Sequence, residues 1–340
     1  MSNQTPIPCH VIAGPLGVGK TTAIIDLLRR RAGREYVAVL VNDFGSVGID
    51  GALIGADAGG EDSLAVQSIP GGCICCTAAA GLATSLKKVL ELPNVNRVIV
   101  EPSGVVATGQ LVDVLRQVTG DGRLDVRPVV VLMDPSRIGS QLVEQMPYFS
   151  RLVEAADVLV ANRCDLASDE QMADFRGWSS RLYPQPMRIL ETTQGVLPDE
   201  VLELQRAAAP SQVCATCGHV HDHDHKHEHT HEHHRHHNHD ASHHAGGLSW
   251  PAAQQFDDGA LMRAIHGLCE TFTDGRFKGV FHTTAGWQYI DIAGGRVNRR
   301  ATEYRRDNRV DWIAPAPGSA PGNAMSEAAM RATLEAARVG

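Results

Sequence analysis

Between residues 8 and 210 the chain alternates short apolar segments with longer amphipathic ones. The apolar segments are rich in valine and isoleucine, which is typical of strands covered on both faces. We expect strands at His10–Ala13, Val37–Val41, Val98–Val100, Val129–Met133, Val158–Ala161 and Met187–Leu190. Apolar residues at helical spacing predict helices at Thr21–Arg31, Ala78–Leu90, Gln110–Val118 and Asp169–Leu182. This alternation indicates an α/β fold with a mostly parallel sheet, whose ligands bind at the carboxyl ends of the strands.

The pattern stops between residues 211 and 247, where 14 of the 17 histidines lie between His219 and His244. Because this stretch offers nothing apolar to pack, we expect a disordered or loosely ordered linker. After it, helical spacing at Ala260–Glu270 and a terminal helix at Ser326–Arg338, with Ser326 as N-cap, predict a second folded part. Its predicted strands are Gly279–Thr283, Trp287–Ile292 and Val310–Ile313, with Gly294 and Gly295 in a turn.

We therefore expect three parts: an α/β domain at 1–210, a histidine-rich linker at 211–247 and a small α+β domain with a terminal helix at 248–340. A length of 340 residues fits two folded domains. The formal net charge of −8 argues against a nucleic-acid partner, because phosphate binding needs clustered Lys and Arg.

No apolar run is long enough to span a membrane, and Met1–Cys9 does not have the pattern of a signal peptide. We therefore expect a cytoplasmic protein. Five of the eight cysteines are grouped, at Cys73, Cys75 and Cys76 and at Cys214 and Cys217. In a chain without a secretion signal, such grouping favours metal or redox chemistry over a disulfide framework.

A phosphate-binding loop is the most specific motif in the sequence. Residues 14–21 fit G-x-x-x-x-G-K-[ST], between a predicted strand and a predicted helix. Backbone N–H groups of such a loop wrap around phosphate oxygens, and the helix N-terminus adds a favourable dipole. We expect Lys20 to reach the β and γ phosphates and the Thr21 hydroxyl to bind Mg²⁺. The predicted nucleotide contacts here are Gly14, Pro15, Leu16, Gly17, Val18, Gly19, Lys20, Thr21 and Thr22.

A base-binding motif follows the strand at Val158–Ala161. Asn162, Arg163 and Asp165 stand where N-K-x-D of GTPases has its guanine contacts, with Arg in place of Lys. Asp165 can accept hydrogen bonds from N1–H and the exocyclic amine of guanine, a pattern that adenine does not offer. Arg163 can cover the base, and Asn162 can either brace the loop or contact N7.

Two carboxylates end strands near the expected phosphate site. We assign Glu101 to the Mg²⁺ shell, through Glu-x-x-Gly, and Asp43 to coupling between nucleotide and metal. Either residue can also be a carboxylate that stabilises a turn, an interpretation that we favour for Asp134.

The C-x-C-C run places three thiols, Cys73, Cys75 and Cys76, within four residues after Gly71 and Gly72. Thiolates select Zn²⁺ or Cu⁺ over Mg²⁺ or Ca²⁺. Since zinc usually takes four ligands, a position remains for Asp43, a water or a partner's residue. A redox or packed thiol cluster is the alternative. The imidazoles of the histidine tract, with Cys214 and Cys217, can buffer metal, or the tract can be a solvated linker.

In this order the motifs resemble those of CobW-like P-loop GTPases, and Val39–Gly45 and Val47–Gly51 are similar to the zinc-binding YeiR-like branch. The family's usual Glu is Asp43 here, and its usual Lys is Arg163. The resemblance implies GTP hydrolysis, use of Mg²⁺, metal binding at Cys73–Cys76 and delivery to a client metalloprotein. We expect catalytic roles for Lys20, Asp43 and Glu101, and zinc as the metal, with Co²⁺ and Ni²⁺ as alternatives.

Other functions remain open at this point. The histidine tract can be the main functional part of a metal-storage protein, or the chain can activate an enzyme by inserting cobalt or iron, as in cobalamin synthesis or nitrile hydratase. ATP-dependent kinase chemistry is disfavoured by Asn162–Asp165. The chain can also assemble as a homodimer.

Overall fold

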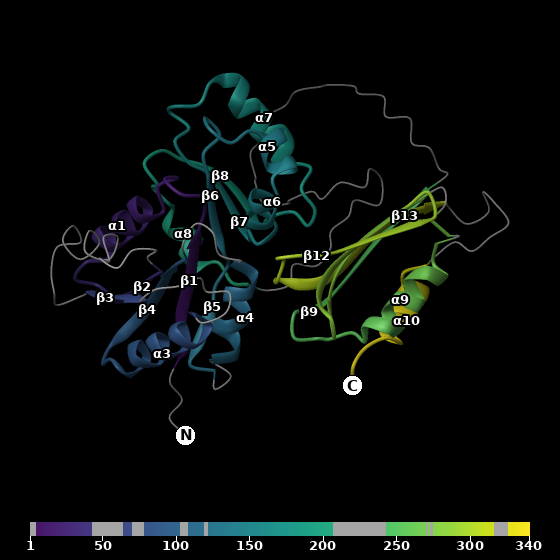
Figure 1. Cartoon of the computed structure of the whole chain (residues 1–340), viewed down its shortest axis with the longest axis horizontal. Helices are drawn as coiled ribbons and strands as arrows, with labels where there is room; N and C mark the ends of the chain where they lie inside the picture. Colours follow the sequence, from purple (N-terminus) through teal and green to yellow (C-terminus); the bar gives the residue numbers. More distant parts are fainter. Residues whose placement is uncertain are drawn as a thin grey trace, which may run out of the picture. The chain divides into compact units, whose positions relative to one another are not determined.

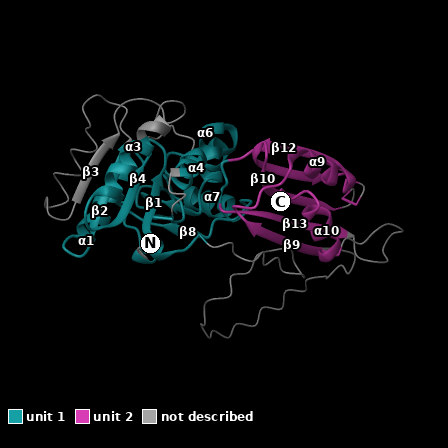
Figure 2. Ribbon diagram, turned by 90° about the horizontal axis from the view of Figure 1, so that it is seen from below, with its two compact units in different colours: residues 1–206, 303–305 teal, residues 207–302, 306–340 magenta. Residues whose placement is uncertain are grey.

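The structure, a computed structural model, describes residues 5–42, 64–69, 78–102, 108–118, 122–206, 243–269, 271–272, 275–315 and 326–340. The chain divides into two compact units (Figure 2). Unit 1 comprises residues 1–206 and 303–305, and unit 2 comprises residues 207–302 and 306–340. The domain limits at 210 and 247 stay a prediction.

Within the described residues, unit 1 is built on an eight-stranded sheet in the order β3-β2-β4-β1-β6-β7-β8, with β5 beside β1 (Figure 1). Every one of its strand pairings is parallel. The predicted parallel α/β fold is confirmed. The strands are β1 (Ile7–Ala13), β2 (Tyr36–Asn42), β3 (Leu64–Ile69), β4 (Val95–Glu101), β5 (Leu124–Val126), β6 (Val130–Met133), β7 (Val158–Ala161) and β8 (Arg188–Glu191).

Helices cover both faces of this sheet, which explains why its strands are almost entirely apolar. Alternate residues of β1 separate the two cores: Val11 belongs to the core under α3, α4, α6 and α7, whereas Ile12 belongs to the core under α1 and α8. The helices of unit 1 are α1 (Lys20–Arg31), α3 (Ala78–Glu91), α4 (Thr108–Val118), α5 (Ser140–Gln145), α6 (Pro147–Glu154), α7 (Asp169–Ser179) and α8 (Asp199–Glu203).

The predicted strands and long helices are found within a few residues of their expected positions, but several short elements were not predicted. These are β3, β5, α5, α6 and α8. Each is at most eight residues long, so that it offers little periodicity to detect. α7 ends at Ser179, three residues before the predicted end at Leu182, and its N-terminus is closed by a capping box of Ser168 and Gln171.

Unit 2 is an antiparallel sheet in the order β12-β11-β10-β13-β9, with α9 and α10 packed on one face (Figure 1). The expected α+β class is confirmed, and Ser326 caps the terminal helix by accepting a hydrogen bond from the backbone N–H of Ala329 at 3.1 Å. The elements are β9 (His243–Pro251), α9 (Asp258–Gly267), β10 (Arg276–Thr283), β11 (Gly286–Ala293), β12 (Arg296–Ala301), β13 (Asp307–Pro315) and α10 (Glu327–Glu335).

β9 begins at His243, inside the range 211–247 that was predicted to be linker. The pairing of β9 with β13 extends to His243 opposite Pro315. Gly246 makes this pairing possible, because a Cβ at that position would lie 2.3 Å from the Trp312 ring. The composition of the tract hides the strand, since its last residues carry little apolar character. Residues 207–242 lie outside the described residues.

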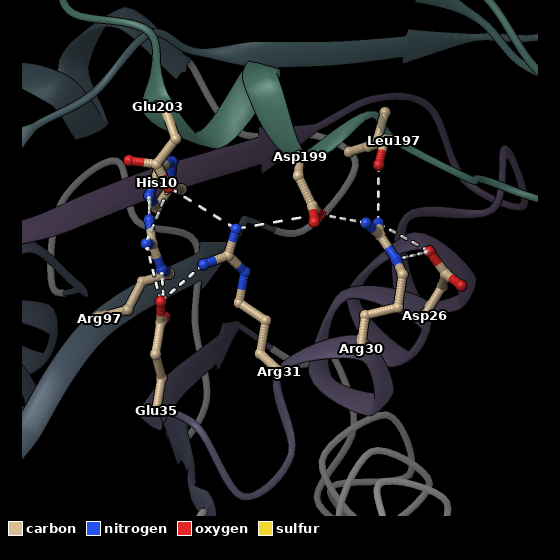
Figure 3. Close-up of polar contacts among 9 residues, drawn as sticks. All are labelled: His10, Asp26, Arg30, Arg31, Glu35, Arg97, Leu197, Asp199 and Glu203. Atoms are coloured by element: carbon tan, nitrogen blue, oxygen red, sulfur yellow. Dashed lines mark hydrogen bonds and ion pairs between the residues drawn. The ribbon is translucent and has the colours of Figure 1, made fainter.

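A network of ion pairs joins the C-terminal end of α1 to β4 and α8 (Figure 3). The Arg97 guanidinium lies 2.8 Å from a Glu35 carboxylate oxygen and 3.3 Å from Glu203. Arg31 contacts the same two carboxylates, at 2.6 and 3.6 Å. The network lies at the end of α1 opposite the phosphate loop, so it stabilises the scaffold of the site rather than the site itself.

His10 lies buried in this network, 1% exposed, with its Nε2 2.6 Å from Nη1 of Arg97 (Figure 3). Because a guanidinium can only donate, Nε2 must accept and the imidazole must be neutral. Burial, followed by the charges of Arg97, Arg127 and Arg31, holds the pKa of His10 well below its usual value of 6.5.

This lowered pKa predicts a pH dependence of stability. The unfolded state takes up a proton at His10 below pH 6.5, whereas the folded state does not, so unfolding becomes more favourable as the pH falls. In His10→Gln, the amide oxygen can still accept from Arg97. Between pH 7.5 and 5.5 we expect the free energy of unfolding of this variant to fall by about 1 kcal/mol less than that of the wild type. Urea denaturation at both pH values measures this difference. The matched control is the exposed His266→Gln, and equal pH slopes for wild type and His10→Gln would contradict the prediction.

Candidate functional site

The phosphate loop connects β1 to α1 at the carboxyl edge of the sheet. Gly19 is the N-cap of α1 and has φ 99°, a left-handed conformation that favours glycine. A Cβ at Gly19 would also lie 2.7 Å from Nδ2 of Asn162. The glycine therefore permits both the turn into the helix and the close approach of the base-binding motif.

Two predicted phosphate-site residues are close together across the sheet. The Thr21 hydroxyl donates to a carboxylate oxygen of Glu101 at 3.0 Å. Glu101 is 4% exposed and ends β4, next to β1. Lys20 is buried, and its ammonium donates to the backbone carbonyl of Pro15 at 3.1 Å, which folds it back over the loop. The hydroxyl of Thr21 on α1 and the carboxylate of Glu101 on β4 thus meet beside the loop. Oxygen donors of this kind suit Mg²⁺.

Asn162 joins three loops at the same edge. Its Nδ2 donates to the carbonyl of Val18 at 2.8 Å, and its Oδ1 accepts from the backbone N–H of Gly195 at 2.9 Å. The side chain is 1% exposed. The sequence analysis allowed Asn162 either to brace the loop or to contact N7 of the base. In the structure its contacts attach the phosphate loop and the loop after β8 to the base-binding motif.

Arg163 adopts a left-handed φ of 63° and lies 3.3 Å from Oδ2 of Asp134. Asp134, 2% exposed, also accepts from the backbone N–H and the hydroxyl of Ser136, at 3.0 and 2.5 Å. Asp134 therefore stabilises the turn after β6, which is the role predicted for it, and it also forms an ion pair with Arg163. The contact fixes the direction in which the Arg163 side chain leaves the loop.

Asp165 is exposed, and within the described part of the chain it makes no hydrogen bond or ion pair. Its neighbour Cys164 is held to Ala161 and Thr192, and burial raises the pKa of the Cys164 thiol. The motif thus presents a carboxylate with unoccupied acceptor positions beside a fixed guanidinium, which suits a flat base that carries two adjacent donors.

Two parts of this site were not predicted. The loop Thr192–Gly195 lies against Asn162 and Cys164, and its Gln194 has a φ of 52°. The polar Thr-Thr-Gln-Gly run after β8 was the available signal. The second part is Arg137, whose Nη1 lies 3.7 Å from the position of a Cβ at Gly17. No motif marks Arg137, because its position follows from the turn after β6.

The predicted transition-metal ligands Asp43, Cys73, Cys75 and Cys76, and the histidine tract up to residue 242, lie outside the described residues. Their neighbours along the chain are described. Asn42 at the end of β2 pairs with Ile69 at the end of β3, and Val41 pairs with Glu101. Among the described residues, no group of three His, Cys, Asp or Glu side chains is arranged to hold a metal ion.

The part of the chain that the structure describes contains no helix that is both long and apolar enough to cross a lipid bilayer.

Comparison with known proteins relates this site to one family. Residues 8–187 match the family model described as CobW/HypB/UreG, nucleotide-binding domain. The zinc chaperone YeiR of Escherichia coli (strain K12) is 31% identical over 212 residues, which cover 62% of this chain and 62% of that protein. The zinc-regulated GTPase metalloprotein activator 1 of Schizosaccharomyces pombe is 29% identical over 210 residues, 60% of this chain and 50% of that protein.

The solved structure of the Zn(II)-bound YjiA GTPase from E. coli matches 99% of this chain and 100% of that one, with 15% identity and a TM-score of 0.46. Among the curated relatives, the matched region of this chain covers less than two thirds of their length.

The contacts of Asn162 predict a defined effect on nucleotide binding. Asn162→Ala leaves the carbonyl of Val18 and the N–H of Gly195 without their partners, which costs about 1–3 kcal/mol for buried groups. We expect the Kd values for GTP and GDP to rise together, by about 10- to 100-fold. Fluorescent nucleotide titration measures them, with the exposed Asn298→Ala as control. Unchanged affinity for both nucleotides would show that Asn162 does not support the site.

Proposed function

The chain belongs to the CobW/HypB/UreG family, and from this premise we propose that it is a GTP-hydrolysing metallochaperone that couples its nucleotide state to the binding and delivery of zinc. The observation that carries the proposal is the meeting of three predicted motifs at one edge of a parallel sheet. The phosphate loop follows β1, Glu101 is the last residue of β4, and Asn162–Asp165 follow β7. Thr21 links the phosphate loop to Glu101, and Asn162 links it to the base-binding motif.

Selection of guanine is supported by Asp165. Its exposed carboxylate follows a braced asparagine and a guanidinium held by Asp134. A carboxylate accepts both N1–H and the exocyclic amine of guanine, whereas adenine presents an acceptor at N1. We therefore propose GTP rather than ATP as the substrate, with Arg163 covering the base.

Hydrolysis is assigned to Lys20, Glu101 and Asp43. Lys20 is positioned to move from the carbonyl of Pro15 onto the β and γ phosphates when nucleotide binds. Thr21 and Glu101 would hold Mg²⁺, and their hydroxyl and carboxylate oxygens fit that ion. When bound, the ion supplies neutralisation of phosphate charge. We propose that Asp43 responds to the nucleotide and shares in metal binding.

The metal cargo is assigned to Cys73, Cys75 and Cys76, with Asp43 as a further ligand. Support comes from the strands on which these segments depend. Asp43 directly follows Asn42, which pairs with Ile69, and the C-x-C-C run begins four residues after Ile69. The two segments therefore follow neighbouring strands that end at paired residues, and β2 is the strand that pairs with Glu101 of β4.

Coupling follows from this neighbourhood. A change of phosphate state at Glu101 acts on the end of β4 and on that of β2, which pairs with it. The Asp43 segment starts from β2, and the C-x-C-C segment starts from β3, which pairs with β2. GTP would order these segments and assemble the metal site, and phosphate loss would relax them and release the metal to a client. The relatives named as a zinc chaperone and as a zinc-regulated GTPase activator favour zinc over cobalt and nickel.

We place this activity in the cytoplasm, where thiols stay reduced. The described cysteines Cys9, Cys164 and Cys269 are all free thiols. We propose that the client is a metalloprotein.

The metal assignment predicts the effect of removing thiols. We expect Cys75→Ser combined with Cys76→Ser to weaken zinc binding at the tight site by at least about 100-fold, because hydroxyls replace two of the thiolates that zinc prefers. GTP affinity should stay nearly unchanged. Competition with a chromogenic chelator measures the zinc Kd, and fluorescent nucleotide titration measures GTP.

The matched control is Cys214→Ser combined with Cys217→Ser, which removes the other thiol pair near the histidine tract. That variant should keep the tight site. Unchanged zinc affinity in the Cys75/Cys76 variant, together with loss in the Cys214/Cys217 variant, would move the metal site to the tract.

A further inference from the structure

We propose that Arg137 is a further catalytic residue, which contacts the terminal phosphates of bound GTP and stabilises the negative charge that develops on them during hydrolysis. The inference rests on the proposed GTPase function and adds a residue that no sequence motif marks. It is an arginine that the chain supplies to its own site.

The position of Arg137 carries the inference. Its Nη1 lies 3.7 Å from where a Cβ of Gly17 would stand. Gly17 is in the middle of the phosphate loop, whose backbone N–H groups surround the β and γ phosphates of a bound nucleotide. Leu16, the preceding loop residue, is 87% exposed, so the loop remains open to solvent on this side of the described chain. Arg137 is exposed, and its long side chain can direct the guanidinium towards a phosphate held by this loop.

The turn that carries Arg137 is held firmly. The carbonyl of Asp134 accepts from the backbone N–H groups of Arg137 and Ile138, at 3.1 and 2.9 Å. The carbonyl of Ser136 accepts from the Gln171 side chain at 3.0 Å, and Ile138 packs against the core. A guanidinium on such a turn loses less conformational entropy on reaching the phosphate than one on a free loop.

The charge of Arg137 is not engaged by another described side chain. Within the described residues its exposed guanidinium makes no ion pair, whereas Arg163 on the neighbouring loop is held by Asp134. A guanidinium binds phosphate through planar, bidentate hydrogen bonds. Arg137 is thus the described arginine beside the phosphate loop whose donors remain open to a phosphate.

The reaction step assigns a definite task to this charge. A water oxygen forms a bond to the γ phosphorus, the bond to the β–γ bridging oxygen breaks with its electron pair remaining on GDP, and the water proton leaves with the phosphate product or solvent. Negative charge increases on the β–γ bridging oxygen as the bond breaks. A guanidinium in contact with that oxygen and a γ oxygen stabilises the transition state more than bound GTP.

The test uses the full chain and compares Arg137→Ala with Arg137→Lys and with the exposed Arg34→Ala, which follows α1 at the end away from the phosphate loop. Steady-state hydrolysis of GTP with Mg²⁺ gives kcat, and titration gives the Kd values for GTP and GDP. We expect Arg137→Ala to lower kcat at least about tenfold, with both Kd values changed less than about threefold. Lysine should restore little, because it lacks the planar fork.

Two further readouts separate a catalytic contact from a structural one. Free guanidinium at low millimolar concentration should restore part of the rate of Arg137→Ala and leave Arg34→Ala unaffected. Binding of GDP with aluminium fluoride, which mimics the transferring phosphoryl group, should be weakened in Arg137→Ala but not in Arg34→Ala.

The outcomes are distinct. A kcat of Arg137→Ala equal to that of the wild type overturns the role of Arg137 and leaves the proposed function intact. A parallel rise of both Kd values with unchanged kcat makes Arg137 a ground-state binding residue and also overturns the proposal. A wild type that neither hydrolyses GTP nor binds GDP with aluminium fluoride overturns the proposed function itself.

Discussion

Parallel pairing of the strands in unit 1 is the constraint on which the rest of this account depends. Because every strand of that sheet runs the same way, the segments that follow β1, β4, β6, β7 and β8 all start at one edge. Hydrogen bonds then turn this neighbourhood into a site. Asn162 attaches the base-binding motif to the phosphate loop and to the loop after β8, and Thr21 attaches α1 to Glu101.

The same constraint supports the proposed coupling between nucleotide and metal. The segments with the predicted metal ligands follow β2, which pairs with β4, and β3, which pairs with β2, at the edge where Glu101 lies. The proposed metal site would be connected to the phosphates through these paired strands. The opposite end of α1 is held by the ion pairs of Arg31 and Arg97, so the helix behind the phosphate loop has a fixed base (Figure 3).

The sequence predicts the parts of this fold that a repeating pattern or a motif determines. Valine-rich strands such as Val158–Ala161 and the phosphate loop fall into this class, and so does the turn function of Asp134. Short elements such as α8 are invisible because five residues carry no period. β9 was not predicted because its first residues are histidines and glycines, which show no apolar pattern although their backbone pairs with β13. The positions of Arg137 and the contacts of Asn162 depend on distances between loops that are far apart in the chain.

The most direct test of the account is the zinc affinity of the full chain in two nucleotide states, measured by competition with a chromogenic chelator. One sample holds Mg²⁺ and a non-hydrolysable GTP analogue, the other holds Mg²⁺ and GDP, and the Cys75→Ser, Cys76→Ser variant run in parallel subtracts the contribution of the histidine tract. The account predicts tighter binding in the GTP-like state, with the difference between states lost in the variant. Equal zinc affinity of the wild type in both states would contradict the coupling between nucleotide and metal.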